Sequence, residues 1–376
     1  MQPRFTSLVA PLPSTVPFVG PEAQERARGL AFRARLGANE SVFGPSPKAV
    51  AVMRHAEAEC WMYCDPENYH LKAALAQELG LSPANIVVGE GIDSLFGYTV
   101  RMFTEPGDAV VSSLGAYPTF NFHVAGYGGR LVTAAYVGDR EDPASLIEAV
   151  RRERPKLLFF ANPDNPMGSW WSADAVQALI DAVPTDTVLV LDEAYIEFAP
   201  PGTAPRLDVS RPNVIRYRTF SKAYGMAGAR IGYAVAEESI AKSFDKIRNH
   251  FSVNRIAQAG ALAALADKAH LASVLEKVAR ARETIGAIAR ANGLAPLVSA
   301  TNFVTIDCGR DGAHAKRVLD GLIAEGVFVR MPGVAPLNRC IRVSAGAEAD
   351  LGVFAGALPK ALGDRASKPV RSIERR

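Results

Sequence analysis

Short apolar runs alternate with amphipathic segments between residues 70 and 236. Seven runs predict β-strands, at Ile86–Val88, Ala109–Ser113, Leu131–Tyr136, Leu157–Ala161, Val188–Leu191, Val214–Arg218 and Ile231–Val235. Apolar residues at helical spacing predict helices at Leu71–Leu79, Asp93–Phe103, Ser145–Arg152 and behind the N-cap Ser172. Helices that alternate with wholly apolar strands are typical of an α/β fold whose sheet is covered on both faces.

The pattern changes after residue 236. Longer helices are predicted at Glu237–His250, Arg255–Ala266 and Leu271–Ala291. Short strands follow at Phe303–Asp307, Val327–Arg330 and Ile341–Val343, with a helix at His314–Glu325 between the first two. We therefore predict an N-terminal arm (residues 1–43), a large domain (44–262), a smaller α+β domain (263–362) and a disordered tail (363–376).

Composition restricts the function further. The chain has 376 residues, 48% of them hydrophobic, and a net charge of +3, which is too small to indicate a nucleic-acid surface. No apolar run is long enough to span a bilayer, and prolines interrupt the N-terminus. The four cysteines form neither metal-type pairs nor a disulfide scaffold. These features predict a cytoplasmic protein with no bound metal, no nucleic acid partner and no membrane partner.

Polar residues follow several predicted strands, where open α/β sheets bind ligands. The loop from Val88 to Ser94 contains two glycines before a helix start, whose free backbone amides would bind a phosphate. A dinucleotide fingerprint is a weaker interpretation, because Ser94 replaces its third glycine. The loop from Ala161 to Gly168 has two Asn-Pro steps, either of which is a candidate for a cis bond, and these fix the amide side chains in place.

An aspartate and a lysine stand at the ends of two successive strands. Asp192 directly follows an apolar strand, and a carboxylate buried there needs a cation, such as a protonated pyridine nitrogen. Lys222 would be a nucleophile if burial and a cation such as Arg230 lowered its pKa. Ser221 and Arg230 supply the donors that hold a phosphate dianion. The combination predicts a pyridoxal 5'-phosphate site, although Lys222 alone could be a solvated lysine in a Gly-rich turn.

From Asn39-Glu40 to Arg342, the sequence resembles the aspartate aminotransferase superfamily of fold type I, and within it the histidinol-phosphate aminotransferase-like group. The resemblance implies a seven-stranded, mostly parallel sheet in the large domain. It implies that Lys222 is the Schiff-base lysine and that Asp192 pairs with the pyridine nitrogen. It further implies the remaining cofactor contacts: Tyr195 and Asn165 at the ring's phenolic oxygen, Tyr117 stacked on the ring, and Ser221, Arg230, Gly91, Ile92 and Asp93 at the phosphate.

The resemblance also implies a homodimer, because Tyr63 matches a tyrosine that reaches the phosphate in the neighbouring subunit. Arg342 matches the arginine that binds the substrate α-carboxylate, Arg330 a second anion-binding arginine, and Asn39 a substrate-site residue. The implied reaction is a ping-pong transfer between an amino donor and a 2-oxo acid, with histidinol phosphate and 2-oxoglutarate as the favoured pair.

Two departures from the group leave the substrate open. Phe18 stands where these enzymes have a tyrosine that bonds the substrate phosphate, and Cys64 replaces a usual proline. An aromatic amino acid is therefore an alternative amino donor. A decarboxylase acting on an amino-acid phosphate is a second alternative, and a regulator that only binds the cofactor is a third, less supported because no DNA-binding segment precedes the domain.

Overall fold

The computed structural model describes residues 4–14 and 18–363. Its largest sheet has seven strands in the order β2-β8-β7-β6-β5-β3-β4. They are β2 (Ile86–Gly89), β3 (Ala109–Ser113), β4 (Arg130–Ala134), β5 (Leu157–Ala161), β6 (Val188–Asp192), β7 (Val214–Thr219) and β8 (Gly232–Val235). Only β8 is antiparallel to its neighbours, β2 and β7. The predicted α/β fold with a mostly parallel seven-stranded sheet is confirmed.

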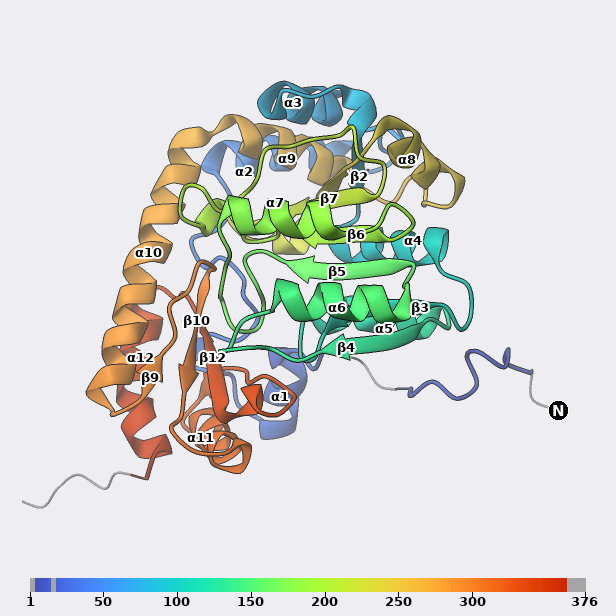
Figure 1. Ribbon diagram of the computed structural model, residues 1–376. Coiled ribbons are helices and arrows are strands. Elements are labelled where there is room, and N and C mark those ends of the chain that lie inside the picture. The colour runs from blue at the N-terminus through green and yellow to red at the C-terminus, as the bar shows by residue number, and fades with distance from the viewer. Residues whose placement is uncertain (1–3, 15–17, 364–376) are drawn as a thin grey trace, which may run out of the picture.

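The central strands are apolar throughout because both faces of the sheet are buried. Along β5, Leu158 and Phe160 belong to one apolar core, whereas Phe159 between them belongs to the other. Helices α6 (Pro143–Glu153) and α7 (Ala173–Ala182) cover the first face, in front of the sheet in Figure 1. Helices α4 (Ile92–Phe103) and α5 (Pro118–Gly126) cover the other. A strand with two buried faces needs an apolar residue at every position, which explains the unbroken runs.

A smaller part is built on a three-stranded antiparallel sheet. Its order is β12 (Cys340–Ser344), β10 (Phe303–Asp307) and β9 (Ala295–Pro296). Helices α11 (Gly312–Ala324) and α12 (Glu348–Ala361) pack beside it, and α10 (Lys268–Ala291) runs along both parts of the molecule (Figure 1). Strand β1 (Ala34–Arg35) pairs in parallel with β11 (Val327–Phe328), so the N-terminal arm joins this smaller part.

The remaining helices flank the large sheet near β2 and β8. They are α2 (Pro47–Ala56), α3 (Tyr69–Leu79), α8 (Glu238–Ser243) and α9 (Arg255–Ala266), while α1 (Pro21–Arg28) belongs to the arm. None of the helices described is long and apolar enough to cross a membrane. Within the same residues, no group of three or more His, Cys, Asp or Glu side chains is arranged to hold a metal ion.

Several predicted boundaries were wrong. The helix expected at Glu237–His250 ends at Ser243 and continues only as a 3-10 turn, Phe244–Lys246. The strand expected at Val327–Arg330 has two residues, and Arg330 instead forms an isolated bridge with Arg342. Helix α5 was missed because its apolar residues point in all directions, and α12 because two glycines and Pro359 lower its helix propensity.

Candidate active site

The carboxyl ends of the parallel strands open into a cavity of about 800 Å³. Segments far apart in the sequence line it: the end of the N-terminal arm, the start of α4, the loops after β3, β5, β6 and β7, and the segment around β12. Twelve of the predicted site residues line this cavity: Asn39, Ile92, Asp93, Tyr117, Asn165, Asp192, Tyr195, Ser221, Lys222, Arg230, Arg330 and Arg342. Gly91 lies directly behind Arg230, and Tyr63 lies elsewhere.

Lys222 lies just beyond the end of β7. The Thr219 hydroxyl accepts a hydrogen bond from the Ser221 backbone N–H at 3.0 Å, which fixes the turn that carries the lysine. The Lys222 Nζ donates to the backbone carbonyl of Asn39 at 3.2 Å. Burial lowers the pKa of Lys222 to about 8, the Arg342 charge adds to this effect, and Arg230 contributes less. Lys222 is half-buried in the cavity wall, which does not fit a fully solvated lysine in a turn, and Arg342 lowers its pKa more than Arg230 does.

Asp192 is the last residue of β6, and its side chain is buried. One carboxylate oxygen accepts the Ala194 backbone N–H at 2.9 Å. Asp192 forms no ion pair with any residue that the structure describes. Burial raises the pKa of Asp192 to about 7, although the Lys222 charge opposes the shift. A buried carboxyl with this environment fits a ligand that brings its own cation.

An anion cradle lies at the start of α4. Gly91 has a φ of +88°, and no side chain caps the helix, whose first-turn amides have no partners within the helix. A Cβ on Gly91 would lie 2.5 Å from Arg230 Nη2, so glycine makes room for this guanidinium. Arg230 also lies 3.5 Å from the Ser221 hydroxyl and 3.7 Å from an Asp93 oxygen. Backbone amides, a hydroxyl and a guanidinium suit a phosphate group.

Two tyrosines and Asn39 lie between these charged groups. Asn39, at a φ of 55°, donates its side-chain amide to the Tyr195 hydroxyl at 3.0 Å. The Ser344 hydroxyl in turn donates to the Asn39 amide oxygen at 3.0 Å. Burial raises the pKa of Tyr195 to about 12, so its hydroxyl keeps a proton to donate. The Tyr117 hydroxyl donates to Asp93 at 2.9 Å, which holds its ring in the cavity wall.

Arg342 connects the loop after β5 to the smaller part of the molecule. Its Nη1 donates to the Asn165 side-chain oxygen, and its Nη2 donates to the Gly37 carbonyl at 3.1 Å. Its Nε is buried without a partner, and burial lowers the pKa of Arg342 to about 10. One of the two candidate bonds in this loop, Asn162–Pro163, is cis. No carboxylate among the described residues pairs with Arg342, which suits a guanidinium that binds an external anion.

Arg330 lies beside Arg342, since the two residues exchange backbone hydrogen bonds. Its Nη2 donates to the Val19 carbonyl at 2.7 Å, and its guanidinium carbon lies 5.3 Å from the centre of the Phe18 ring. Arg330 makes no ion pair within the described part of the chain, and burial lowers its pKa. The cavity therefore contains two neighbouring cations, neither of which forms an ion pair with a described residue.

Several buried charged residues that pack beneath the site were not predicted from the sequence. Glu193 is buried and pairs with Arg216 and Arg218 on β7. Glu141 and Asp164 are two further buried acids beneath the loop that carries Asn165. The alternation of Arg216 and Arg218 along an otherwise apolar strand is a sequence signal for a buried counter-charge. No local pattern indicates that Glu141 and Asp164 are neighbours.

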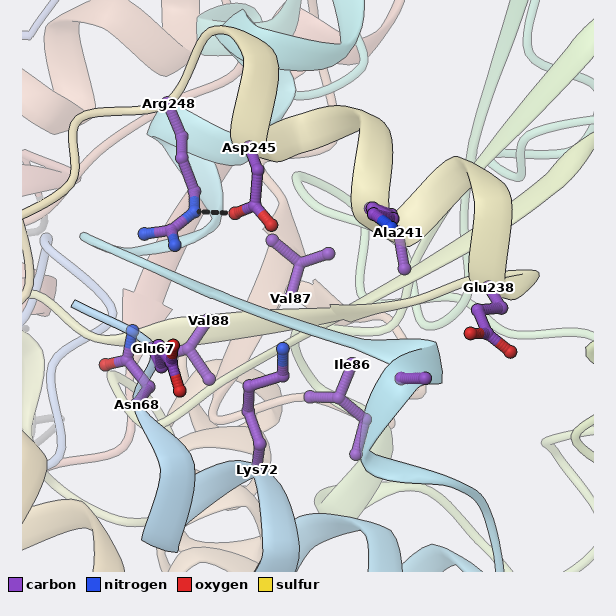
Figure 2. Close-up of a pocket in the computed structure, with 12 residues that line it drawn as sticks. Glu67, Asn68, Lys72, Ile86, Val87, Val88, Glu238, Ala241, Asp245 and Arg248 are labelled. Atoms are coloured by element: carbon purple, nitrogen blue, oxygen red, sulfur yellow. Dashed lines mark hydrogen bonds and ion pairs between the residues drawn. The ribbon is translucent and has the colours of Figure 1, made fainter. Parts of the chain in front are cut away.

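A second pocket, of about 220 Å³, lies beside the edge strand β2. Figure 2 shows the Lys72 side chain extending into it from α3, between Ile86 and Val88 of the edge strand β2. Asp245 and Arg248, on its far side, pair with each other at 2.6 Å. Burial lowers the pKa of Lys72 as well. A lysine beside an edge strand is a common protection against pairing with other chains.

Comparisons with known proteins agree with this geometry. The family described as aminotransferase class I and II matches residues 34–358. Histidinol-phosphate aminotransferase from Anaeromyxobacter sp. (strain Fw109-5) is 36% identical over 359 residues, which are 94% of this chain and 98% of the relative. Histidinol-phosphate aminotransferase 1 from Mesorhizobium japonicum is 38% identical over 339 residues, covering 88% of this chain and 90% of the relative.

Solved structures extend the likeness to the fold. The crystal structure of histidinol-phosphate aminotransferase from Sinorhizobium meliloti, in complex with pyridoxal-5'-phosphate, is 55% identical and superposes with a TM-score of 0.94, over 97% of this chain and 99% of that one. A Thermus thermophilus aspartate aminotransferase variant, 22% identical, shares the fold with a TM-score of 0.79 over 96% of this chain and 100% of that one. The chain belongs to the aminotransferase class I and II family and has its fold type I architecture.

Proposed function

We propose that this chain is a pyridoxal 5'-phosphate-dependent aminotransferase that moves an amino group from histidinol phosphate to 2-oxoglutarate. The observation that carries the proposal is one cavity that holds both Lys222, with a pKa lowered to about 8, and Asp192, a buried carboxyl with no cationic side chain paired to it. The relatives named above supply the substrate.

The cofactor residues have complementary charges. When bound, pyridoxal phosphate supplies an electron-accepting ring that stabilises negative charge at the substrate Cα. Asp192 would keep the ring nitrogen protonated, and Tyr195 and Asn165 would donate to the ring's phenolic oxygen. Arg230, Ser221 and the backbone of Gly91, Ile92 and Asp93 would hold the phosphate, and Tyr117 would cover the ring.

Lys222 has two roles in the proposed reaction. Its lowered pKa leaves part of the population with a free lone pair near neutral pH, which suits covalent attachment of the cofactor. When its Nζ is free, Lys222 would take the proton from the substrate Cα and hold it for return, as a general base and then a general acid. Its contact with the Asn39 carbonyl holds the amine on the cavity side.

The two arginines support a donor and an acceptor that both carry anions. Arg342 would bind the α-carboxylate of glutamate or 2-oxoglutarate, next to Asn39. Arg330, 5.3 Å from the Phe18 ring, would bind the second anion, namely the phosphate ester of histidinol phosphate. Phe18 lines the same cavity and offers no hydrogen-bond donor, which favours an aromatic amino acid as the second candidate donor.

The assembly belongs to the same proposal. Tyr63 is 76% exposed, stacks on Phe251 with ring centres 4.6 Å apart, and lies outside its own chain's cavity. We propose a homodimer in which Tyr63 reaches the phosphate of the partner subunit. We also propose the division into an arm (residues 1–43), a large domain (44–262) and a small domain (263–362), working in the cytoplasm; of the segment 363–376, only residue 363 is described.

The test is the visible absorption spectrum of the purified protein during addition of single amino donors. Glutamate and histidinol phosphate should each remove the band of the lysine-bound cofactor. Loss with phenylalanine or tyrosine, and not with histidinol phosphate, would favour the aromatic donor. Release of carbon dioxide without a keto product would identify a decarboxylase. No band after addition of pyridoxal phosphate would overturn the proposal.

A further inference from the structure

Two buried acids that have no role in the proposed reaction lie beneath the loop that carries Asn165. Glu141 follows the end of β4, Asp164 follows β5, and each side chain is 1% exposed. Each carboxyl group is among the groups that shift the pKa of the other through a side-chain hydrogen bond. Two buried carboxylates that face each other cannot both be charged without a large cost, so the pair holds a proton at neutral pH.

The surrounding donors indicate which acid carries that proton. Asp164 accepts the Tyr136 hydroxyl at 2.8 Å on one oxygen and the Met167 backbone N–H at 3.1 Å on the other. Glu141 Oε2 accepts the Ser113 hydroxyl at 2.9 Å, and its Oε1 has no donor. Both oxygens of Asp164 thus accept hydrogen bonds, as the oxygens of an ionised carboxylate do. Glu141 Oε1 accepts none, so it is the oxygen that can carry a proton and donate a hydrogen bond.

The pKa shifts of the two acids favour the same assignment of the proton. Burial, followed by the Asp164 charge, raises the pKa of Glu141 well above its usual range. Burial also raises the pKa of Asp164, to about 6, while its donors, including Glu141, and the Arg342 charge oppose the rise. Besides each other, the titratable groups that face the pair are Tyr136, Tyr195 and Arg342. Protonated Glu141 and ionised Asp164 are therefore the favoured forms near neutral pH.

Asp164 controls the shape of the loop in front of it. Its backbone carbonyl accepts Gly168 N–H at 3.1 Å, and its backbone N–H donates to the Ser169 carbonyl at 2.8 Å. With the Met167 contact, these bonds close the loop around the carboxylate. The next residue, Asn165, receives the Arg342 guanidinium on its side-chain oxygen. The acid pair is thus one residue away from the contact that orients Arg342.

We propose that Asp164 and Glu141 act as a positioning pair: Glu141, protonated, donates to the Asp164 carboxylate, which fixes the loop so that Asn165 orients Arg342 toward an incoming carboxylate. This inference rests on the proposed function for the meaning of Arg342. The pair itself is a property of the folded chain and is testable without turnover.

Replacing each acid by its isosteric amide tests the two residues individually. In Glu141→Gln, the amide NH₂ replaces the acid proton as donor to Asp164, and the amide oxygen still accepts from Ser113. In Asp164→Asn, an NH₂ must face the Tyr136, Met167 or Glu141 donor, so the loop is disturbed. We expect Glu141→Gln to bind succinate, an unreactive dicarboxylate, within about twofold of the parent, and Asp164→Asn to bind it roughly tenfold or more weakly. Glu141→Leu should behave like Asp164→Asn.

Thermal unfolding against pH tests the proton independently. The raised pKa of Glu141 means that the acid contributes most stability below its unfolded pKa, and that this contribution is lost as pH rises. Glu141→Gln has no such proton, so its melting temperature should gain on the parent by about 2 °C or more between about pH 5 and pH 8. Glu197→Gln is the matched control, because burial raises the pKa of Glu197 to about 7 but the residue lies beside Arg218. It should leave succinate binding unchanged.

The opposite pattern, with Glu141→Gln weakened and Asp164→Asn unchanged, would overturn the assigned proton. Equal effects of both amides on succinate binding would overturn the positioning role. A pH-independent difference in melting temperature would overturn the shared proton. A parent protein that shows no cofactor band after addition of pyridoxal phosphate would contradict the proposed function alone, since the melting experiments do not use the cofactor. Near-ultraviolet circular dichroism identifies any variant that fails to fold, and Glu141→Leu then replaces Asp164→Asn.

Discussion

Asp192 and Glu193 are consecutive carboxylates at the end of β6, and both are buried, yet their surroundings are opposite. Asp192 faces the cavity and has no ion pair within the described residues. Glu193 pairs with Arg216 and, at 2.9 Å, with Arg218. Burial raises the pKa of both acids, but the two arginines more than offset this for Glu193, whose pKa is lowered, while that of Asp192 rises to about 7.

The charge of Glu193 therefore stabilises the fold, whereas the charge of Asp192 is available to a bound ligand. Successive residues of a strand point to opposite faces, so Glu193 meets the arginines of β7 and Asp192 meets the ligand cavity. The chain compensates Glu193 internally, and Asp192 stays destabilising until a cation arrives.

Loss of the nucleophile should have the largest effect. Lys222→Ala should remove the visible band of the lysine-bound cofactor and lower turnover by about 10⁴-fold or more, because both covalent attachment and proton transfer depend on Nζ. Lys72→Ala is the matched control, since burial also lowers the pKa of Lys72 but this residue lines the other pocket (Figure 2). It should keep the band. Turnover retained by Lys222→Ala would contradict the assignment.

Removing the compensated charge should affect stability. Glu193→Gln should lower the free energy of unfolding by about 3–5 kcal/mol, because Arg216 and Arg218 would stay buried without their partner. Denaturant unfolding measures this change. The folded fraction should still bind cofactor. A variant as stable as the parent would show that Glu193 does not stabilise the fold as described.

Removing the uncompensated charge of Asp192 should lower turnover and raise the stability of the cofactor-free protein. Asp192→Asn should lower turnover roughly 10²- to 10³-fold. The raised pKa of Asp192 means that the stability it contributes is present below pH 3.8 and is lost as pH rises through about 7. The cofactor-free variant should therefore gain on the parent over this range, by on the order of 4 kcal/mol at pH 8. A loss of stability at that pH would show that Asp192 is compensated within the chain.

The smallest effect is expected at the second arginine. Arg330→Gln should raise the KM for histidinol phosphate roughly tenfold or more and leave the KM for histidinol, the same donor without its phosphate, nearly unchanged, because only the former would bring an anion to this guanidinium. Steady-state kinetics with each donor measures the ratio. Equal changes for both donors would remove Arg330 from the phosphate subsite.

The sequence predicted the parts of this comparison that depend on local pattern. Asp192 and Lys222 each follow an apolar strand, so the strand assignment alone brings both to one edge of the sheet. The partners of Glu193 require knowledge of which face each residue of β6 occupies. The proposed pairing of Glu141 with Asp164 depends on the path of the loop after β4, in which the Tyr136 hydroxyl donates to Asp164. The bond from Asn39 to Tyr195 depends on a positive φ that no residue pattern specifies.

The most direct test of the central claim is the carboxyl ¹³C NMR signal of Asp192, assigned by its absence in Asp192→Asn and followed against pH. In the cofactor-free protein, we expect the carboxyl of Asp192 to have a pKa near 7. Addition of pyridoxal phosphate should move the titration below about pH 5, because a ring cation then faces the carboxylate. An ordinary pKa near 4 that the cofactor leaves unchanged would contradict the claim that this carboxyl is reserved for an external cation.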